Sequence, residues 1–421
     1  MLSDRIPNCL MRGAAFWSVL IASFMATTGY SVLLSVVPLW VSVNGSGAFG
    51  AGVSTGIFML TTVGTQLAVP WLMRRRSART LFAVSLVLVG APAPLLALSG
   101  QLAPVLVWSA VRGVGFGVFS VVSNALVAEL APVAEHGRAT ARYGLAVGIP
   151  QLVMVPGGVG LATHLGFTSV FVLAAAPLLG LVPLAFLRLP AKANGVSTAR
   201  PSVAEAPITD RAPGSAHPES DPAPDARVVS RVFLGPLLTM VATSMAQGGL
   251  ITFLPLTRFG AGGYVVPGAL FGTVAGSVVG RLICGELVDR RGFGGRMLLP
   301  GMALAAVGML VELCAVGFVA DPTLAMSLLV ASSVTVGVGF GLVQNDSLVS
   351  MFAAAGPRRY GTASAIWNIG YDAGTGAGAV GLGALAQPFG FPTAFGASAG
   401  LLLAASPLVR RGPRTRPARP S

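Results

Sequence analysis

The chain has 421 residues, of which 54% are hydrophobic and only 10% are Asp, Glu, Lys or Arg. Soluble globular domains carry about 25% charged residues, so this composition excludes an ordinary soluble protein and indicates a membrane protein. The net charge of +13 would suggest nucleic acid as the partner of a soluble chain, but here the basic residues follow a membrane pattern. We therefore expect a lipid bilayer, and not nucleic acid, as the partner.

Apolar runs of about 20 residues recur along the chain, each long enough to cross a hydrocarbon core of about 30 Å as a helix. The first lacks a small-residue cleavage site and is too long for a signal peptide, so we interpret it as a retained span. Twelve spans are predicted: Ala14 to Trp40, Ala48 to Leu72, Leu81 to Leu98, Pro104 to Leu130, Ala139 to Ala162, Phe167 to Leu187, Val232 to Leu256, Val265 to Val288, Leu298 to Val319, Thr323 to Ala354, Thr362 to Ala386 and Phe391 to Leu408.

The basic residues predict the orientation of these spans. Only Arg112 and Arg281 lie well inside spans, and Arg258 lies in a loop after an odd-numbered span; the other Lys and Arg residues lie in or beside the termini and the loops after even-numbered spans. Because cytoplasmic loops are enriched in Lys and Arg, we expect a multi-pass protein of the cell membrane with both termini cytoplasmic. We expect Arg281 to reach the cytoplasmic interface along its flexible side chain.

Composition also divides the chain into two halves. Residues 188–231 are rich in Pro, Ala, Ser and both charges, which is typical of a disordered linker. The predicted organisation is a cytoplasmic amino terminus (1–13), a six-helix bundle (14–187), the cytoplasmic linker (188–231), a second six-helix bundle (232–408) and a basic cytoplasmic tail (409–421). The sequence GVGFG occurs at 113–117 and again at 337–341, which indicates that the halves arose by duplication.

The stretch GRLICGELVDRRGFGGR, from Gly280 to Arg296, concentrates charge at the end of the eighth span. With twelve spans, two halves and a long linker, it resembles the signature of the major facilitator superfamily of transporters. The resemblance implies an all-α integral membrane protein with twelve transmembrane helices in two pseudo-symmetric six-helix halves. It also implies a gating latch made by Gly285, Asp289, Arg290, Gly292 and Arg296. In the first half, Met73 stands where the matching Asp would be.

The same resemblance implies a function. In this superfamily the substrate site lies between the halves, and rocking of one half against the other gives alternating access. The fifth span, GLAVGIPQLVMVPGGVG, is similar to a signature of proton-coupled exporters, although the usual Gly-Pro pair is missing. We expect an efflux antiporter that exports a hydrophobic or amphipathic small molecule against protons. Proton-coupled uptake of a metabolite is the alternative, and a membrane-embedded enzyme or a non-transporting sensor ranks behind both.

Two carboxylates lie within the tenth and eleventh spans, which the resemblance implies are helices that form the cavity. Asp346 shares a helical face with Gly339, Thr335 and Ser332, and Asp372 shares one with Ser364, Asn368 and Thr375. A carboxylate removed from water can take up a proton on one side of the membrane and release it on the other. Asp346 and Asp372 are therefore the proton-coupling candidates, while Glu312 in the ninth span is expected to make a structural contact.

Further polar residues in the spans are candidates for lining the cavity. Arg112, a buried cation, could hold an anionic group of the substrate or pair with a carboxylate across the cavity. The other substrate-cavity candidates are Thr27, Tyr30, Ser31, Gln151, Thr243, Gln247, Asn345, Trp367 and Asn368.

The remaining chemistry-bearing residues form no recognisable site. The three Cys and three His residues lack metal-ligand spacing, and no nucleophile or paired catalytic acid stands out. We expect no catalytic residues, no metal and no cofactor, with the transmembrane proton gradient as the energy source. A monomer is expected, and the identity of the substrate stays open.

Overall fold

The computed structural model describes residues 5–131, 136–185, 226–257, 263–291, 294–355 and 360–410. Within these ranges the chain is helical apart from short connections, which confirms the predicted all-α class. The first half contains α1 (Arg5–Leu34), α2 (Val36–Val41), η1 (Ser42–Ser46), α3 (Gly47–Arg75), α4 (Ala78–Gly90), η2 (Pro94–Leu98), α5 (Leu102–Leu130), α6 (His136–Leu165), α7 (Phe167–Leu173), η4 (Ala176–Gly180) and α8 (Leu181–Ala185). The second half contains α9 (Ala226–Thr257), α10 (Val265–Arg291), α11 (Leu298–Gly317), α12 (Pro322–Ala355) and α13 (Tyr360–Arg410).

Ten helical segments of the described chain are long and apolar enough to cross a membrane. Two of them, Ala14–Arg75 and Gly361–Pro407, contain a break where the backbone leaves the helical conformation. Gly45 and Gly390 adopt φ values of 92° and 81°, which residues with a side chain rarely adopt. Each of these two segments is therefore long enough for two crossings, and the described residues then provide twelve, as the sequence predicts.

The observed helices extend beyond the predicted limits of the two bundles. Most of the predicted linker, 188–231, lies outside the described residues, as do residues 1–4 and 411–421. Two helices begin before the predicted bundles do, α1 at Arg5 and α9 at Ala226. The division at 188–231 stays a prediction.

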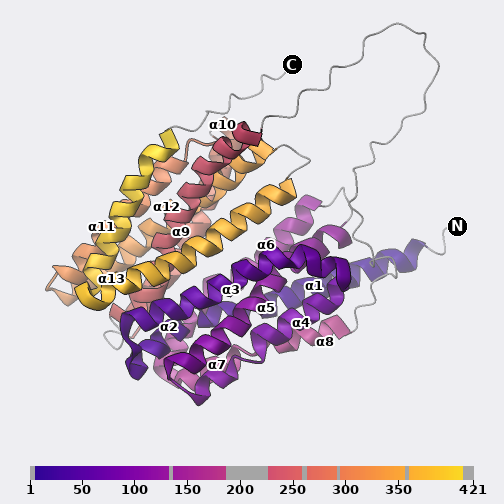
Figure 1. Ribbon diagram of the computed structural model, residues 1–421, viewed down its shortest axis with the longest axis horizontal. Coiled ribbons are helices and arrows are strands. Elements are labelled where there is room, and N and C mark those ends of the chain that lie inside the picture. The colour runs from indigo at the N-terminus through magenta and orange to yellow at the C-terminus, as the bar shows by residue number, and fades with distance from the viewer. Residues whose placement is uncertain are drawn as a thin grey trace, which may run out of the picture.

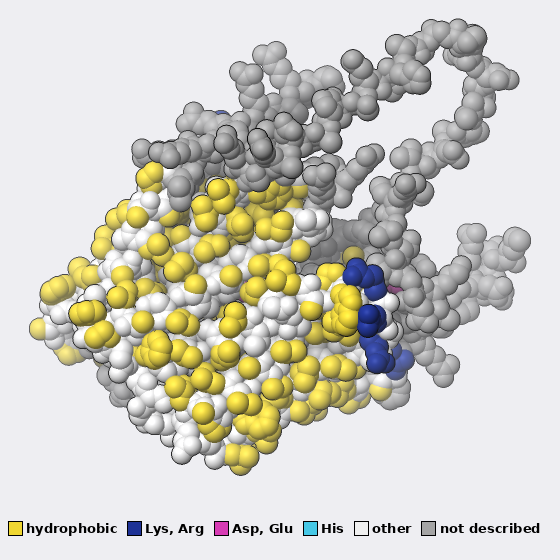
Figure 2. Space-filling model, in the orientation of Figure 1, with side chains coloured by type: hydrophobic (Ala, Val, Ile, Leu, Met, Phe, Trp, Pro, Cys, Tyr) yellow, Lys and Arg dark blue, Asp and Glu magenta, His cyan; other side chains and the backbone are white. Residues whose placement is uncertain are grey.

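The halves are joined at one end of the molecule and diverge toward the other. Figure 1 shows α3 and the first part of α13 approaching each other at the left and separating toward the right. Basic side chains gather at the right in Figure 2, whereas the rest of the described surface in that view shows hydrophobic and uncharged groups. Arg74 and Arg75 belong to the last turn of α3, which ends on that side. We call this side the basic end and the other side the closed end.

Close packing and hydrogen bonds hold the closed end together. The Phe49 N–H donates to Gln387 Oε1 over 3.2 Å, joining α3 to α13. Gly52 lies so near the Ala379 carbonyl that a Cβ atom would overlap it. Glycines let helix backbones approach to this distance without a hydrophobic driving force between them. The first half of α3 is thereby fixed against α13.

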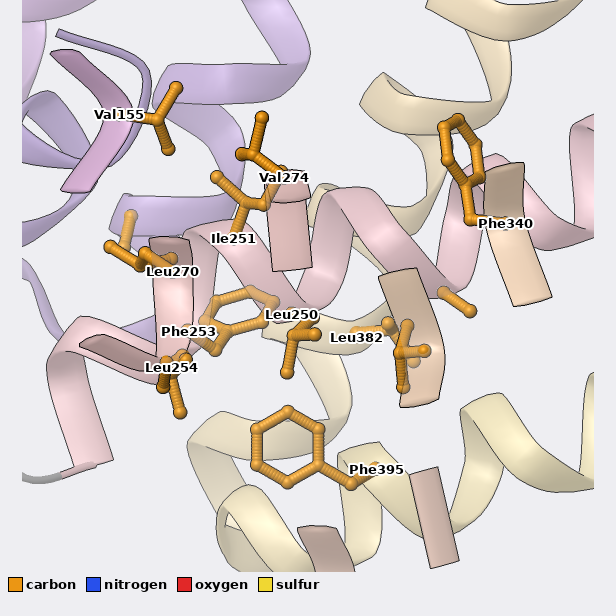
Figure 3. Close-up of a cluster of buried hydrophobic side chains, with 14 of the residues drawn as sticks. Val155, Leu250, Ile251, Phe253, Leu254, Leu270, Val274, Phe340, Leu382 and Phe395 are labelled. Carbon is orange, nitrogen blue, oxygen red and sulfur yellow. The ribbon is translucent and has the colours of Figure 1, made fainter. Parts of the chain in front are cut away.

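A continuous apolar core reinforces the closed end (Figure 3). Val155 of α6 lies in one buried cluster with Leu270 and Val274 of α10 and with Phe253 of α9. The cluster contains side chains from both halves, so the halves share a dry interface here. Toward the basic end, Leu67 and Trp71 of α3 are 66% and 47% exposed.

Candidate functional site

Two adjoining hollows lie beside the closed end, the first lined by the first half alone and the second by both halves. The first, of about 300 Å³, is lined by Tyr30, Leu33, Leu34, Val37, Pro38, Ser54, Thr55, Phe58, Ser109 and Arg112. The second, of about 270 Å³, is lined by Tyr30, Leu34, Thr55, Gln247, Gly248, Ile251, Thr252, Tyr371 and Thr375. They share Tyr30, Leu34 and Thr55, so we treat them as one central cavity. Thr55 Oγ1 and Thr252 Oγ1 lie 3.5 Å apart across the halves.

Aromatic rings form much of the cavity wall. The ring of Tyr30 stacks on Phe116 with centroids 4.0 Å apart, and on Phe58 at 5.7 Å. In the second half, Tyr371 stacks on Trp367 at 6.2 Å. Such rings give a ligand a large apolar contact area beside the polar groups of the wall, a combination that is typical of small-molecule sites.

Arg112 of α5 is buried within the first half, with only 3% of its surface exposed. Its Nε donates to the Val89 carbonyl over 3.2 Å and its Nη2 to the Gly29 carbonyl over 3.3 Å. The guanidinium lies 5.6 Å from the centre of the Phe58 ring. These contacts tie α5 to α1 and α4, while the side chain still lines the cavity.

Asp372 of α13 makes a hydrogen bond across the halves. Gln66 Nε2 of α3 donates to Asp372 Oδ2 over 2.7 Å and also to Ser120 Oγ of α5 over 3.1 Å. The exposed fractions are 4% for Asp372 and 6% for Gln66. Along α3, hydrogen bonds join the halves at Phe49, Thr55 and Gln66, and Gln66 is the nearest of the three to the basic end. Asp372 therefore lies where the two halves begin to diverge.

The environment of Asp372 is polar on one side only. The hydroxyls of Tyr30 and Tyr371 both interact electrostatically with its carboxylate. Among the described residues, Gln66 Oε1 is buried and has no hydrogen-bond partner. The Gln66 amide thus places next to one carboxylate an N–H group that is already hydrogen-bonded and an oxygen that has no hydrogen-bond partner.

Asp346 of α12 does not lie in the cavity, contrary to the sequence prediction of its position. Its carboxylate is fully buried and accepts three backbone N–H groups, from Gly295 at 2.6 Å, Met297 at 2.7 Å and Leu298 at 3.0 Å. These groups belong to the connection after α10 and to the first residue of α11. The carboxylate therefore caps α11, where free N–H groups and the helix dipole favour a negative charge.

Three members of the polar face of α12, namely Ser332, Gly339 and Asp346, meet α11, while Thr335 Oγ1 donates to the Ala331 carbonyl of its own helix. Ser332 Oγ donates to Glu312 Oε2 of α11, and Gly339 lies directly against Gly301 of α11. Both contacts lie on the face that continues to Asp346. The predicted polar face of α12 exists, but its contacts join helices of the same half. Glu312 makes the contact between helices that we expected of it.

The other predicted cavity residues divide into two groups. Tyr30, Arg112 and Gln247 line the cavity. Thr27 and Thr243 are fully buried and hydrogen-bond within their own helices, and Asn368 donates to the Ser364 carbonyl of its own helix. Trp367 Nε1 donates to Ser347 Oγ over 2.9 Å, and Asn345 lies against Cys284 of α10. Ser31 is fully buried and Gln151 is half-buried, and neither is among the residues that line the cavity.

The predicted gating residues are only partly described. The side chain of Asp289 and the whole of Gly292 lie outside the described part of the chain. Arg290 is exposed and pairs with Glu286 of its own helix. Arg296 is also exposed and engages in a contact. Gly285 lies in α10 near the Asn345 amide.

Three residues of the site were missed by sequence reasoning. Gln66 and Tyr371 contact or adjoin Asp372, and Arg281 of α10 interacts electrostatically with the Tyr371 hydroxyl. Gln66 could have been singled out because a buried amide within a span needs partners. Arg281 was expected at the cytoplasmic interface, and its side chain lies within electrostatic range of Tyr371, which lines the cavity.

Two helical halves around a central cavity with polar and aromatic walls are typical of a membrane transporter. Residues 19–356 match the family model of the Major Facilitator Superfamily, so the chain belongs to this superfamily. It is a multi-pass secondary transporter and not an enzyme, and the predicted family is confirmed. No curated protein sequence matches the chain closely enough to count as a relative.

Solved structures of transporters share the fold at low identity. A bacterial homologue of the human lysosomal transporter Spinster, in an inward-facing and occupied conformation, superposes with a TM-score of 0.73 at 13% identity over 97% of this chain and 99% of that one. A point mutant of the peptide transporter POT, in complex with alafosfalin, gives 0.72 at 15% identity over 94% and 93%. The nucleoside transporter NupG gives 0.70 at 11% identity over 94% and 98%. At these identities the similarity concerns the fold alone.

Proposed function

We propose that this chain is a proton-coupled exporter of hydrophobic or amphipathic small molecules. The observation that carries the proposal is the buried hydrogen bond between Asp372 and Gln66, which joins the two halves at the edge of the cavity. A carboxylate at this place can exchange a proton in one conformation and be tied to the opposite half in another.

The orientation follows from the basic end. Cytoplasmic loops carry the excess of Lys and Arg, so the basic end is assigned to the cytoplasm and the closed end to the exterior, in the cell membrane. The halves diverge toward the basic end, which corresponds to a cavity reached from the cytoplasm (Figure 1). A substrate in the cytoplasm or the inner leaflet would enter this conformation first, as export requires.

The substrate class follows from the cavity wall. Leu33, Leu34, Val37 and the rings of Tyr30 and Phe58 form its apolar part, and Ser54, Thr55, Ser109 and Arg112 add polar groups beside them. A sugar or nucleotide carries polar groups on nearly every side, and those that meet the apolar part would be left without partners, at a cost of about 1–3 kcal/mol for each. An amphipathic molecule with a large apolar body loses the fewest hydrogen bonds when it enters the cavity.

Coupling of substrate export to proton movement follows from competition between the substrate and a proton for the Asp372 carboxylate. In the observed arrangement Gln66 donates an N–H to the carboxylate, which suits the ionised form. A proton on Asp372 turns one of its oxygens into a donor, for which the unused Gln66 Oε1 is the available acceptor. If a polar group of the substrate and a proton occupy the carboxylate in turn, each excludes the other, and the linkage makes the protein an antiporter.

The gating role of Gly285, Asp289, Arg290, Gly292 and Arg296 stays part of this proposal. Their segment adjoins the N–H groups that Asp346 holds, so a movement of the connection between α10 and α11 would pass through Asp346. We expect Asp289→Asn to disturb conformational cycling.

The test is transport into and out of liposomes that contain the purified protein and an imposed pH gradient. A panel of amphipathic compounds, followed by fluorescence or radiolabel, should include some that move against the direction of proton flow. Asp372→Asn should abolish this gradient-driven movement and keep exchange of substrate for substrate. Movement in the same direction as the protons would favour the uptake alternative, and unaltered antiport by Asp372→Asn would contradict the coupling assignment.

A further inference from the structure

Arg281 occupies a face of α10 that leads into the space between the halves. Leu270 and Val274 of this helix pack with Val155 of α6 in the shared core (Figure 3). Arg281 follows Val274 by about two turns, which places it on the same face, displaced toward the basic end. Its surface is exposed, whereas Leu270 is fully buried. This face of α10 is thus packed in the core at Leu270 and carries an exposed cation at Arg281.

The side chain lies within electrostatic range of the hydroxyl of Tyr371, which lines the cavity, and Arg281 itself lies beside that lining. About ten more residues of α10 follow before Arg291, a length of about 15 Å. The backbone at Arg281 is wedged against Gly341 of α12, so the helix cannot turn the side chain elsewhere without separating the two helices.

Arg281 has no anionic partner in the described part of the chain. The ion pair found there joins Arg290 to Glu286. Asp372 is bound by Gln66, and Asp346 by three backbone N–H groups. A cation within a membrane span costs at least about 2.5 kcal/mol, so such residues pair with a partner or serve a ligand.

We propose that Arg281 binds a carboxylate of the transported molecule, whose apolar body then lies against Tyr371 and Tyr30. The planar guanidinium offers two parallel N–H groups to a carboxylate, a geometry that an ammonium ion lacks. Asp372, nearer the closed end, is left to exchange its proton. This inference rests on the proposed function and narrows its substrate class to amphipathic carboxylates.

The test is equilibrium binding of three matched probes to the purified full-length protein, without a gradient. Naphthylacetate, naphthylacetamide and naphthylethylamine have similar apolar bodies with an anionic, a neutral and a cationic head. The wild type should bind naphthylacetate the most tightly, with a dissociation constant about tenfold below that of naphthylacetamide, as expected for one charge-assisted contact.

The variants assign this preference to one residue. Arg281→Gln should remove it, Arg281→Lys should keep part of it, and Arg75→Gln should leave it unchanged. Arg75 is the matched control because its guanidinium stacks on Trp71, 4.2 Å from the ring centre, at the basic end of α3. Thermal unfolding of each variant checks that it is folded.

A wild type that prefers the amide or the amine, or that binds none of the probes, would overturn the inference, as would a carboxylate preference that survives in Arg281→Gln. In each case Arg281 would have to find its partner within the protein. The proposed function fails differently, since it requires loss of gradient-driven transport in Asp372→Asn and makes no claim about these binding constants.

Discussion

The polar faces of α12 and α13 have the same helical period but opposite surroundings. In α12, Ser332 and Asp346 are bound by groups of the neighbouring helix α11 within the same half. In α13, Asp372 is bound by a side chain of the other half. A buried carboxylate saturated by backbone N–H groups has a fixed charge and a fixed position, whereas one held by a single amide across a mobile boundary can change both. The donors therefore assign a contact within one half to Asp346 and a contact between the halves to Asp372, on which the proposed coupling role rests.

The largest expected difference between the two aspartates concerns coupling. Asp372→Asn should lose gradient-driven transport entirely, because an amide cannot exchange a proton, while Asp346→Asn should retain it. Liposomes matched for protein content, with the pH gradient as the variable, measure both. Equal losses in the two variants would show that the faces of α12 and α13 do not differ in function.

Stability should show the reverse order. Asp346→Ala leaves the N–H groups of Gly295, Met297 and Leu298 without their acceptor, at a cost of about 2–4 kcal/mol. Thermal unfolding in detergent should therefore show a marked fall in Tm. Asp372→Asn, which keeps a polar group of the same size beside Gln66, should unfold within a few degrees of the wild type. A Tm that falls more in Asp372→Asn would contradict the capping role.

A double-mutant cycle on the cross-half bond gives an intermediate effect. Gln66→Leu and Asp372→Ala each remove the contact, so their effects on the rate of substrate exchange should not add. The expected interaction energy is about 1.5–3 kcal/mol, typical of a hydrogen bond to a charged group. Gln66→Leu with Asp346→Asn serves as the control cycle, and its effects should add. Additivity in the first cycle would mean that the bond does not take part in transport.

The smallest expected effect is at the other end of the polar face of α12. Ser332→Ala removes the hydroxyl that donates to Glu312, which should lower the free energy of unfolding by about 1 kcal/mol. Transport and its dependence on the gradient should not change, since both helices belong to one half. A coupling defect in Ser332→Ala would show that the polar face of α12 takes part in proton coupling.

These contrasts show what the sequence could and could not predict. The number of spans, their approximate limits and the division into halves depend on apolar length, which is visible in any sequence. Asp346 and Asp372 each share a face with other polar residues, but periodicity alone does not say which helix that face meets. The direction of Asp346 depends on the packing of Gly339 against Gly301, a contact between helices that no local pattern specifies.

Gln66 and Arg281 illustrate a second limit. The motif around Met73 at the end of the second span is incomplete, and no pattern in that span indicates that the Gln66 amide meets the other half. Arg281 was expected to reach the interface because distance along the helix was the sole guide. Its position relative to Tyr371 depends on how α10 and α13 pack around α12, which the sequence does not give.

The central claim is that Asp372 is the carboxyl group that exchanges the coupled proton. Infrared difference spectroscopy of the purified protein, recorded while the pH is changed, detects the C=O stretch of a carboxyl group as it gains or loses a proton. We predict a titrating band that disappears in Asp372→Asn and persists in Asp346→Asn. A band that persists in Asp372→Asn, or that disappears in Asp346→Asn instead, would contradict the account.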